Sequence, residues 1–264
     1  MKKNIFLALV FLSMIMSVNA QDSNPPKLYL LMEFMHVSDA NGSNYWDVEQ
    51  FWSGIHKQRV ADKKIIGWDL WSLSPSGSNQ GAQYMTVTLF SSLKDMLEAA
   101  SSLDAMGYAK KAYPKKSEKE LIDMFDKTGK SRDRADQVFF EQVDMTKGDF
   151  TMKVGTIATM DVMKQKEDNY EKAESDIFKP WHQSLVDAGK KGSWQILRAI
   201  LPSGSDSYGT HLTVSMYKDA DQLASFMQSS GGELDLKTQL AVNEGLKTRE
   251  WKQMKVGTLL MMVR

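Results

Sequence analysis

The chain has 264 residues, with 33 lysine and arginine residues, 33 aspartate and glutamate residues, and no cysteine. The balanced charge argues against an electrostatic footprint for nucleic acid, and the lack of cysteine excludes disulfides and a cysteine nucleophile. A chain of this length is long enough for two domains that each bury a core without covalent crosslinks.

The N-terminal residues have the pattern of a secretory signal peptide. Lys2 and Lys3 precede an apolar run over 5–16, and a small-residue cleavage site ends at Ala20. The run is too short to cross a bilayer as a helix, and no later stretch approaches the ~20 apolar residues that a span requires. We therefore expect residues 1–20 to be a signal peptide, and the mature protein to be soluble and periplasmic or secreted, with no membrane span.

The first element of the mature chain is a predicted strand over 28–37, and a helix follows. Both alternating faces of the strand are largely apolar, so it must be covered on both sides. A loop rich in Asn, Gly and Ser then leads to a helix over 45–61. Trp52 and His56 share the apolar stripe of this helix, which points His56 toward the core.

A hairpin, two helices and a strand complete this segment. Two β-rich runs at 65–73 and 82–90 are separated by a cluster of Pro, Gly, Ser and Asn, which predicts a hairpin. A helix begins near Ser92, a short extra helix with a capping box is predicted at 117–127, and 137–143 forms a last strand. The order is strand, helix, strand, strand, helix, strand.

This pattern occurs twice. His56 matches His182 and Trp68 matches Trp194 at one offset, 126 (182 − 56), and after one inserted residue the Pro-Ser-Gly-Ser turn at 75–78 meets the turn at 202–205. A match of this length is hard to obtain by chance. We therefore expect two copies of one domain.

The second copy begins near Phe150, directly after the first. Its first strand is predicted at 151–160, its first helix carries Phe178 and His182, and its last strand falls within 251–263. The junction between the copies has no linker composition. We place the first repeat at 22–147 and the second at 148–264, and expect them to share an interface; the alternative is two independent domains on one chain.

A βαββαβ unit is a ferredoxin-like arrangement, with both helices on one face of a four-stranded antiparallel sheet. Because the strands are apolar on both faces, the bare face of each sheet must bury itself against the other copy. In element order, and in the pattern of His56, Trp68, 86–87 and Phe90 with their partners, the chain resembles the dimeric α/β-barrel superfamily. The resemblance implies an α+β fold of two ferredoxin-like repeats packed sheet to sheet in one chain, and a monomer with a pseudo-dimeric barrel.

The resemblance also implies ligand cavities between the helices and the sheet of each half, where the stripes place His56 and His182. An imidazole there could hydrogen-bond a carbonyl, act as a general base, or ligate a metal or haem iron. The alternative is a core histidine satisfied by a backbone carbonyl or a buried water. The same residue in both copies supports either interpretation.

Aromatic residues and a second polar group complete the candidate ligand-binding set. Trp68 and Trp194 are core residues or flat walls of a pocket, and Trp52 and Phe178 lie on the two helix stripes. On the third strand the copies differ, with Tyr84 in the first and His211 in the second. His182 and His211, with Asp206 or Tyr208, form the nearest approach to a polar cluster.

Other kinds of site have no motif in this sequence. It contains no glycine-rich phosphate loop, no Gly-x-Ser-x-Gly elbow and no His-Glu-x-x-His, and its histidines lack the spacing of a compact zinc site. We expect an exported protein that binds a small, mostly apolar or aromatic molecule, with no nucleic acid partner, metal or cofactor. The alternatives are an enzyme resembling the superfamily's cofactor-independent monooxygenases or its haem-binding and haem-degrading members, and a structural or interaction protein of the cell envelope.

Overall fold

The computed structural model describes residues 27–38, 42–77, 79–229 and 233–264, so the predicted signal peptide lies outside the described residues. The strands are β1 (Tyr29–His36), β2 (Gly67–Ser74), β3 (Tyr84–Phe90), β4 (Asp133–Met145), β5 (Ile157–Gln165), β6 (Ser193–Leu201), β7 (His211–Tyr217) and β8 (Arg249–Val263). The helices are α1 (Gly42–Ala61), α2 (Leu93–Ser102), α3 (Ala105–Ala112), α4 (Glu118–Ser131), α5 (Tyr170–Ala173), the π-helix η2 (Glu174–Phe178), α6 (Lys179–Asp187), α7 (Ala220–Gln228) and α8 (Leu236–Lys247). We call the part from β1 to β4 the N-terminal half and the part from β5 to β8 the C-terminal half.

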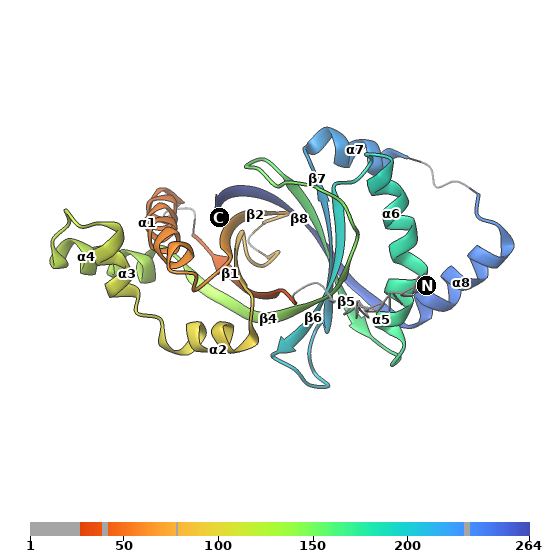
Figure 1. Cartoon of the computed structure of the whole chain (residues 1–264), viewed down its shortest axis with the longest axis horizontal. Helices are drawn as coiled ribbons and strands as arrows, with labels where there is room; N and C mark the ends of the chain where they lie inside the picture. The colour runs from red at the N-terminus through yellow and green to blue at the C-terminus, as the bar shows by residue number, and fades with distance from the viewer. Residues whose placement is uncertain (1–26, 39–41, 78, 230–232) are drawn as a thin grey trace, which may run out of the picture.

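The strands form one closed barrel, which confirms the α+β class. Their order around the barrel is β1-β3-β2-β8-β5-β7-β6-β4, and every pairing is antiparallel. The four strands of each half are neighbours, and the pairs β2–β8 and β4–β6 join the halves. In Figure 1 the helices of the N-terminal half flank one side of the barrel and those of the C-terminal half flank the other. All helices of the described residues therefore lie outside the barrel.

The interior of the barrel is one apolar core that both halves supply. Leu30 and Met32 of β1 pack there in the same cluster as Leu212 and Val214 of β7. The intervening β1 residues face the helices, in a separate cluster that includes Met35. The sequence prediction that this strand is covered on both faces is confirmed, and the inner faces of the two halves are buried against each other.

Two element boundaries differ from the sequence prediction. The helix that begins after Ser92 ends at Ser102, and α3 starts separately because the carboxylate of Asp104 accepts the backbone N–H of Gly107 as an N-cap. The first strand of the C-terminal half begins at Ile157 rather than near 151, since Gly155 has a φ of 92° and turns the chain just before it.

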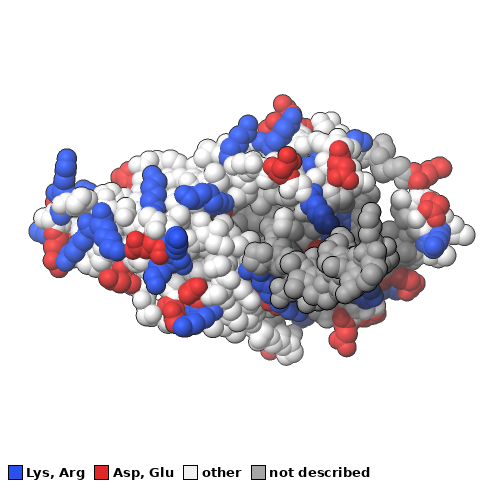
Figure 2. Space-filling model, in the orientation of Figure 1, with Lys and Arg blue, Asp and Glu red and all other residues white. Residues whose placement is uncertain are grey.

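The surface carries both signs of charge. Figure 2 shows lysine and arginine interspersed with aspartate and glutamate over the visible face, without a large region of one sign. Within the described ranges no helix combines the length and hydropathy that crossing a bilayer demands.

Candidate functional site

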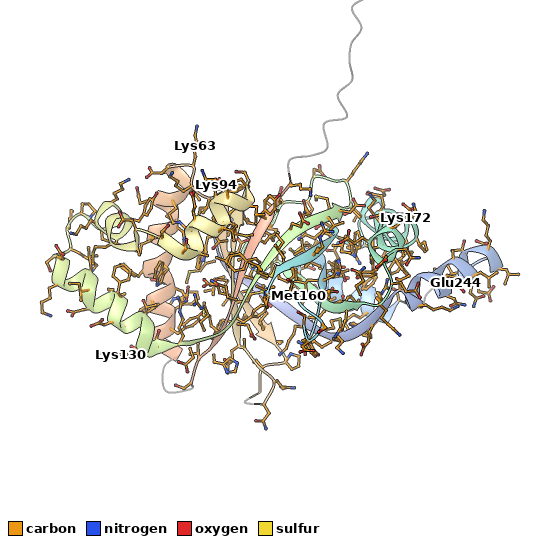
Figure 3. All side chains as sticks on the ribbon, turned by 90° about the horizontal axis from the view of Figure 1, so that it is seen from below. Lys63, Lys94, Lys130, Met160, Lys172 and Glu244 are labelled. Carbon is orange, nitrogen blue, oxygen red and sulfur yellow. The ribbon has the colours of Figure 1, made fainter. Side chains whose placement is uncertain are left out.

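A cavity of about 750 Å³ lies inside the barrel at one end. Its deep wall is apolar and comes from both halves, with Phe34, Val138 and Phe140 from the N-terminal half and Met160 and Val162 from the C-terminal half. Figure 3 shows Met160 in the middle of the molecule, between the helices of the two halves. These side chains alternate along their strands with residues that face the helices, so the closed barrel itself forms the cavity.

The rim of this cavity is polar. The β6–β7 loop over 202–209 and the exposed Asp136 line it, together with Lys255 of β8. The Lys255 ammonium donates to the backbone oxygens of Pro75 (2.8 Å) and Gln80 (2.5 Å), which ties the C-terminal half to the β2–β3 loop. Burial lowers the pKa of Lys255. An apolar interior with a few polar groups at its opening is typical of a small-molecule site.

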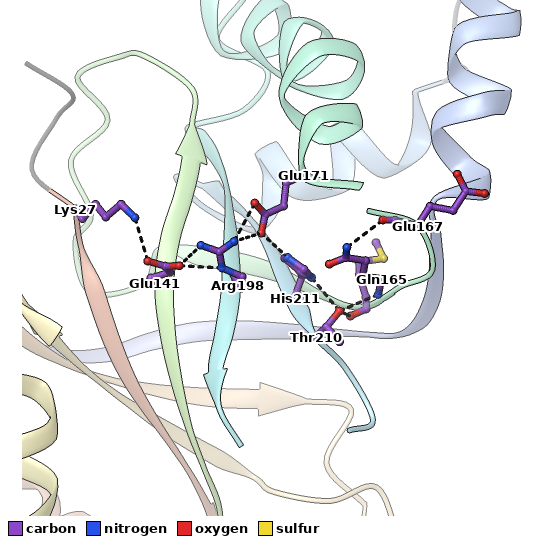
Figure 4. Close-up of polar contacts among 9 residues, drawn as sticks. Lys27, Glu141, Gln165, Glu167, Glu171, Arg198, Thr210 and His211 are labelled. Atoms are coloured by element: carbon purple, nitrogen blue, oxygen red, sulfur yellow. Dashed lines mark hydrogen bonds and ion pairs between the residues drawn. The ribbon is translucent and has the colours of Figure 1, made fainter. Parts of the chain in front are cut away.

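His211 borders the same cavity, but its side chain turns to the helix-facing side of β7, where a polar network fixes it (Figure 4). Its Nε2–H donates to Glu171 Oε1 (2.9 Å), and its Nδ1 accepts from the hydroxyl of Thr210 (2.9 Å). Glu171 also pairs with Arg198 (3.0 Å), whose Nε donates to Glu141 of β4 (2.8 Å). Burial lowers the pKa of His211 although Glu171 opposes the shift. Both ring nitrogens are thus engaged, and the network connects β7 to α5 and to the N-terminal half.

His56 lies on the outer face of the barrel, where α1 covers β2. Its ring stacks on Trp68 with centroids 4.9 Å apart and planes at 16°, and Trp52 flanks it at 5.8 Å. The Arg59 guanidinium donates to Nδ1 at 3.1 Å. Burial, reinforced by the Arg59 charge, holds the pKa of His56 well below its usual value. This imidazole is therefore neutral.

His182 makes the matching contacts in the C-terminal half. Its ring stacks on Trp194 at 4.8 Å and 12°, and the Lys191 ammonium donates to Nδ1 at 2.9 Å. Burial, with the charges of Lys191 and Arg249, lowers the pKa of His182 to about 2. Each half thus contains a neutral histidine between an indole and a cation.

The remaining candidates also lie on the outer side of the barrel. Tyr84 packs on Tyr45 with ring centroids 4.6 Å apart, and the Arg249 guanidinium lies 4.1 Å from the ring centre of Phe178. The barrel cavity is not lined by Tyr84, Tyr45 or Phe178.

The barrel cavity brings together only part of the polar cluster expected from the sequence. Asp206 and Tyr208 line it and His211 borders it, whereas His182 does not. Sequence reasoning missed the apolar wall and Lys255. The alternation of residues along each strand was the signal available for finding them. It does not tell which of the two strand faces turns inward, because that is decided when the barrel closes.

Three of the four histidines, His56, His182 and His211, do not fit the role of a haem ligand. An axial ligand needs a ring nitrogen that faces open space. His56 and His182 present Nδ1 to a cation and a ring face to an indole, and His211 has both nitrogens engaged. In the part of the chain that the structure describes, no three or more His, Cys, Asp or Glu side chains are grouped to hold a metal ion.

No protein-family model matches the sequence, and neither does any curated protein. Solved structures are nevertheless similar over most of the chain. A candidate monooxygenase from Fusobacterium nucleatum superposes with a TM-score of 0.56 at 9% identity, covering 90% of this chain and 94% of that one. An anthrone oxidase-like protein gives 0.54 at 10% identity, covering 90% and 93%. A haem-binding protein from Thermus thermophilus gives 0.50 at 10% identity, covering 89% and 91%. The chain has the fold of the dimeric α/β-barrel superfamily, and at these identities the likeness shows the fold alone.

Proposed function

We propose that the protein binds a small, mostly apolar molecule inside the barrel, with the apolar part in the interior and a polar group at the rim. The observation that carries this proposal is the cavity of about 750 Å³, whose apolar wall comes from both halves. Its volume falls within the roughly 300–1,000 Å³ usual for ligand pockets. A barrel that served only as a structural module would gain stability from filling this space with side chains.

Among the residues selected from the sequence, we keep Asp206 and Tyr208 in the proposed site, and we assign the His211 side chain to the packing between β7 and α5, where it bonds Glu171. The positions of Asp206 and Tyr208 along the cavity wall support this choice. For His56, Trp68, Trp52, Tyr84, Trp194 and Phe178 the contacts support packing roles outside the barrel, and we propose no ligand contact for them in this cavity.

A fluorescence titration with the neutral probe N-phenyl-naphthylamine tests the binding proposal. Ala199 lines the cavity, so Ala199→Trp fills part of it, whereas Ala61→Trp adds the same bulk at the exposed end of α1. We expect Ala199→Trp to weaken binding by about tenfold or more, equivalent to about 1.4 kcal/mol, and Ala61→Trp to leave it unchanged. Equal affinities in both variants would place the probe elsewhere and support the structural or interaction role instead.

Cofactor-independent oxygenation of the bound molecule is the second candidate. The similar folds of a candidate monooxygenase and an anthrone oxidase-like protein favour it, by analogy of fold alone. An oxygen electrode with an anthrone as probe tests it. If the protein is an oxygenase, the rate of oxygen uptake should fall in Ala199→Trp and persist in Ala61→Trp. Oxygen uptake by the wild type no faster than in buffer would leave only the binding role. We propose no function for His56, His182 or His211 as haem ligands.

We further propose that residues 22–147 and 148–264 are two ferredoxin-like repeats of one ancestral unit, exported with residues 1–20 as signal peptide and monomeric in solution. The strand orders β4-β1-β3-β2 and β8-β5-β7-β6 support the duplication, because both follow the same sequence of first, second, third and fourth strands. Mass spectrometry of the protein from the periplasm and the medium of an expressing cell would give the location and the cleavage site. An intact N-terminus in the cytoplasm would contradict export.

A further inference from the structure

Among the described residues that line the barrel cavity, Lys255 is the only lysine or arginine. It lies on β8 directly opposite Met160 of β5, a residue of the apolar wall, and residues paired in this way point to the same face of a sheet. Gly257, two residues further along β8, shares that face, because a Cβ there would lie 2.9 Å from the Met160 methyl group. The Lys255 side chain therefore starts from the inner face of the barrel.

The Lys255 ammonium is held at the opening of the cavity by two hydrogen bonds. Nζ donates to the backbone oxygens of Pro75 and Gln80, at 2.8 and 2.5 Å. Gln80 itself lines the cavity, so these bonds fix Nζ beside the opening. An ammonium has three N–H groups, so one donor remains. Both acceptors are neutral, and the positive charge is left without a counter-charge.

Within the described ranges, no carboxylate balances the charge of Lys255. Asp136 and Asp206 also line the rim, but both are exposed to solvent. Neither contributes to the pKa of Lys255, which burial alone lowers. A partly buried ammonium beside an apolar cavity is stabilised when an anion pairs with it.

We propose that the ligand of the barrel is an organic acid, an apolar body that carries one carboxylate, and that Lys255 binds this carboxylate at the rim. The inference rests on the binding function proposed above and names the chemical class of the ligand. The third N–H of Nζ donates to a carboxylate oxygen, and the hydroxyls of Ser203 and Ser207, which line the same rim, are further donors. The apolar body lies against Phe140 and Met160.

An organic amine is the competing class of ligand, because Asp136 and Asp206 line the same rim. Their carboxylates are exposed and hydrated, so an ion pair with either contributes little binding free energy. Lys255 is partly withdrawn from water, and its two bonds to the β2–β3 loop fix its position. The geometry of the rim therefore favours an anion over a cation.

Displacement of the neutral probe N-phenyl-naphthylamine at pH 7 tests this inference with three ligands of equal chain length, decanoate, decanol and decylamine. Lys255→Met removes the charge and keeps the length of the side chain, and Lys255→Arg keeps the charge. Lys153→Met removes an exposed lysine that precedes β5 and does not line the cavity. We expect the ratio of decanoate to decanol affinity to fall about fivefold or more in Lys255→Met. It should keep its wild-type value in Lys255→Arg and Lys153→Met.

The affinity ratio separates a lost ion pair from a loosened cavity. A variant that only frees the β2–β3 loop weakens decanoate and decanol equally, so an unchanged ratio in Lys255→Met would overturn the inference. Tighter binding of decylamine than of decanoate by the wild type would also overturn it, and that comparison needs no variant. In both cases binding of the neutral probe would still support a site in the barrel. A wild type that does not bind the probe would instead contradict the proposed function, and the inference with it.

Discussion

Two histidines of this chain are set as hydrogen-bond acceptors by their neighbours. The donors at Nδ1, Arg59 for His56 and Lys191 for His182, leave the remaining ring proton on Nε2. Protonating either ring would place a second buried positive charge about 3 Å from the first. The two imidazoles are therefore unsuited to act as general bases near neutral pH.

The depressed histidine pKa values predict a loss of stability in mild acid. In the folded protein His56 and His182 stay neutral, whereas unfolded histidines bind protons below about pH 6.5. The contribution of the two neutral rings to the free energy of unfolding is complete above that pH. It decreases as the pH falls, by up to about 1.4 kcal/mol per pH unit for each histidine. Urea unfolding between about pH 7 and pH 5 should show a steeper decline for the wild type than for His56→Asn/His182→Asn, in which asparagine keeps an acceptor near the Nδ1 position. Parallel declines would mean that these rings titrate normally.

The sequence predicted the positions of these histidines better than their chemistry. The three- and four-residue spacing along the helix correctly predicted that His56 is buried. His182, which the proposed repeat pairs with it, stacks on a tryptophan in the same way. The cations were not predictable in the same way. Lys191 aligns with Ile65 of the other copy (191 − 126 = 65), so the repeat offers no partner for it, and its burial depends on the fold of the whole C-terminal half.

At the scale of elements, the seam between β2 and β8 closes the barrel and contains a buried carboxylate. Asp69 is 3% exposed, and the Arg264 guanidinium binds its two oxygens at 2.7 and 3.0 Å. Burial raises the pKa of Asp69 against the opposing effect of Arg264. This pair connects the two halves across a seam that local sequence patterns do not predict.

Removing Arg264 should therefore weaken the seam. We expect Arg264→Leu to cost about 2 kcal/mol of unfolding free energy at pH 7, below the usual value for a fully buried pair because Arg264 is partly exposed. This loss of unfolding free energy should be smaller in mild acid, where Asp69 takes up a proton. It should also be smaller in the double variant Asp69→Asn/Arg264→Leu, in which no carboxylate is left without its partner. Urea unfolding of these variants measures the loss. A single variant that loses no stability would show that solvent, not Arg264, compensates the carboxylate.

Local signals predicted elements well where the stabilising contacts were also local. The capping box at the start of α4 is present, with Ser117 accepting the Glu120 N–H (3.3 Å) and Glu120 accepting the Ser117 N–H (2.7 Å). The start of β5 was placed too early because residues before Gly155 have strand-like composition but turn away from the sheet. Edge pairing between β2 and β8 joins residues far apart in the chain, and no short-range pattern encodes it.

At the scale of the molecule, the barrel interior makes the two halves interdependent. Met32 and Val87 of one half share a core with Met160 and Leu259 of the other. Separating the halves would expose this core and leave β2, β4, β6 and β8 as free sheet edges. The two-domain organisation expected from the repeat therefore need not mean two folding units.

We expect the intact chain to unfold in one cooperative transition and the isolated segment 148–264 to lack one. The segment should bind a hydrophobic dye strongly and self-associate, since its inner face has no partner. Thermal unfolding followed by circular dichroism, with size-exclusion chromatography of both proteins, measures this. A monomeric, dye-free segment with its own sharp transition would contradict a shared core.

The account depends most on where an apolar molecule binds. A crystal of the protein with bromonaphthalene would locate the bromine by its anomalous scattering. We predict a peak inside the barrel, between Phe140 and Met160 and within reach of the rim at Lys255. A peak only on the outer face, beside the His56–Trp68 or the His182–Trp194 stack, or no ordered bromine at saturating ligand, would contradict a binding site in the barrel.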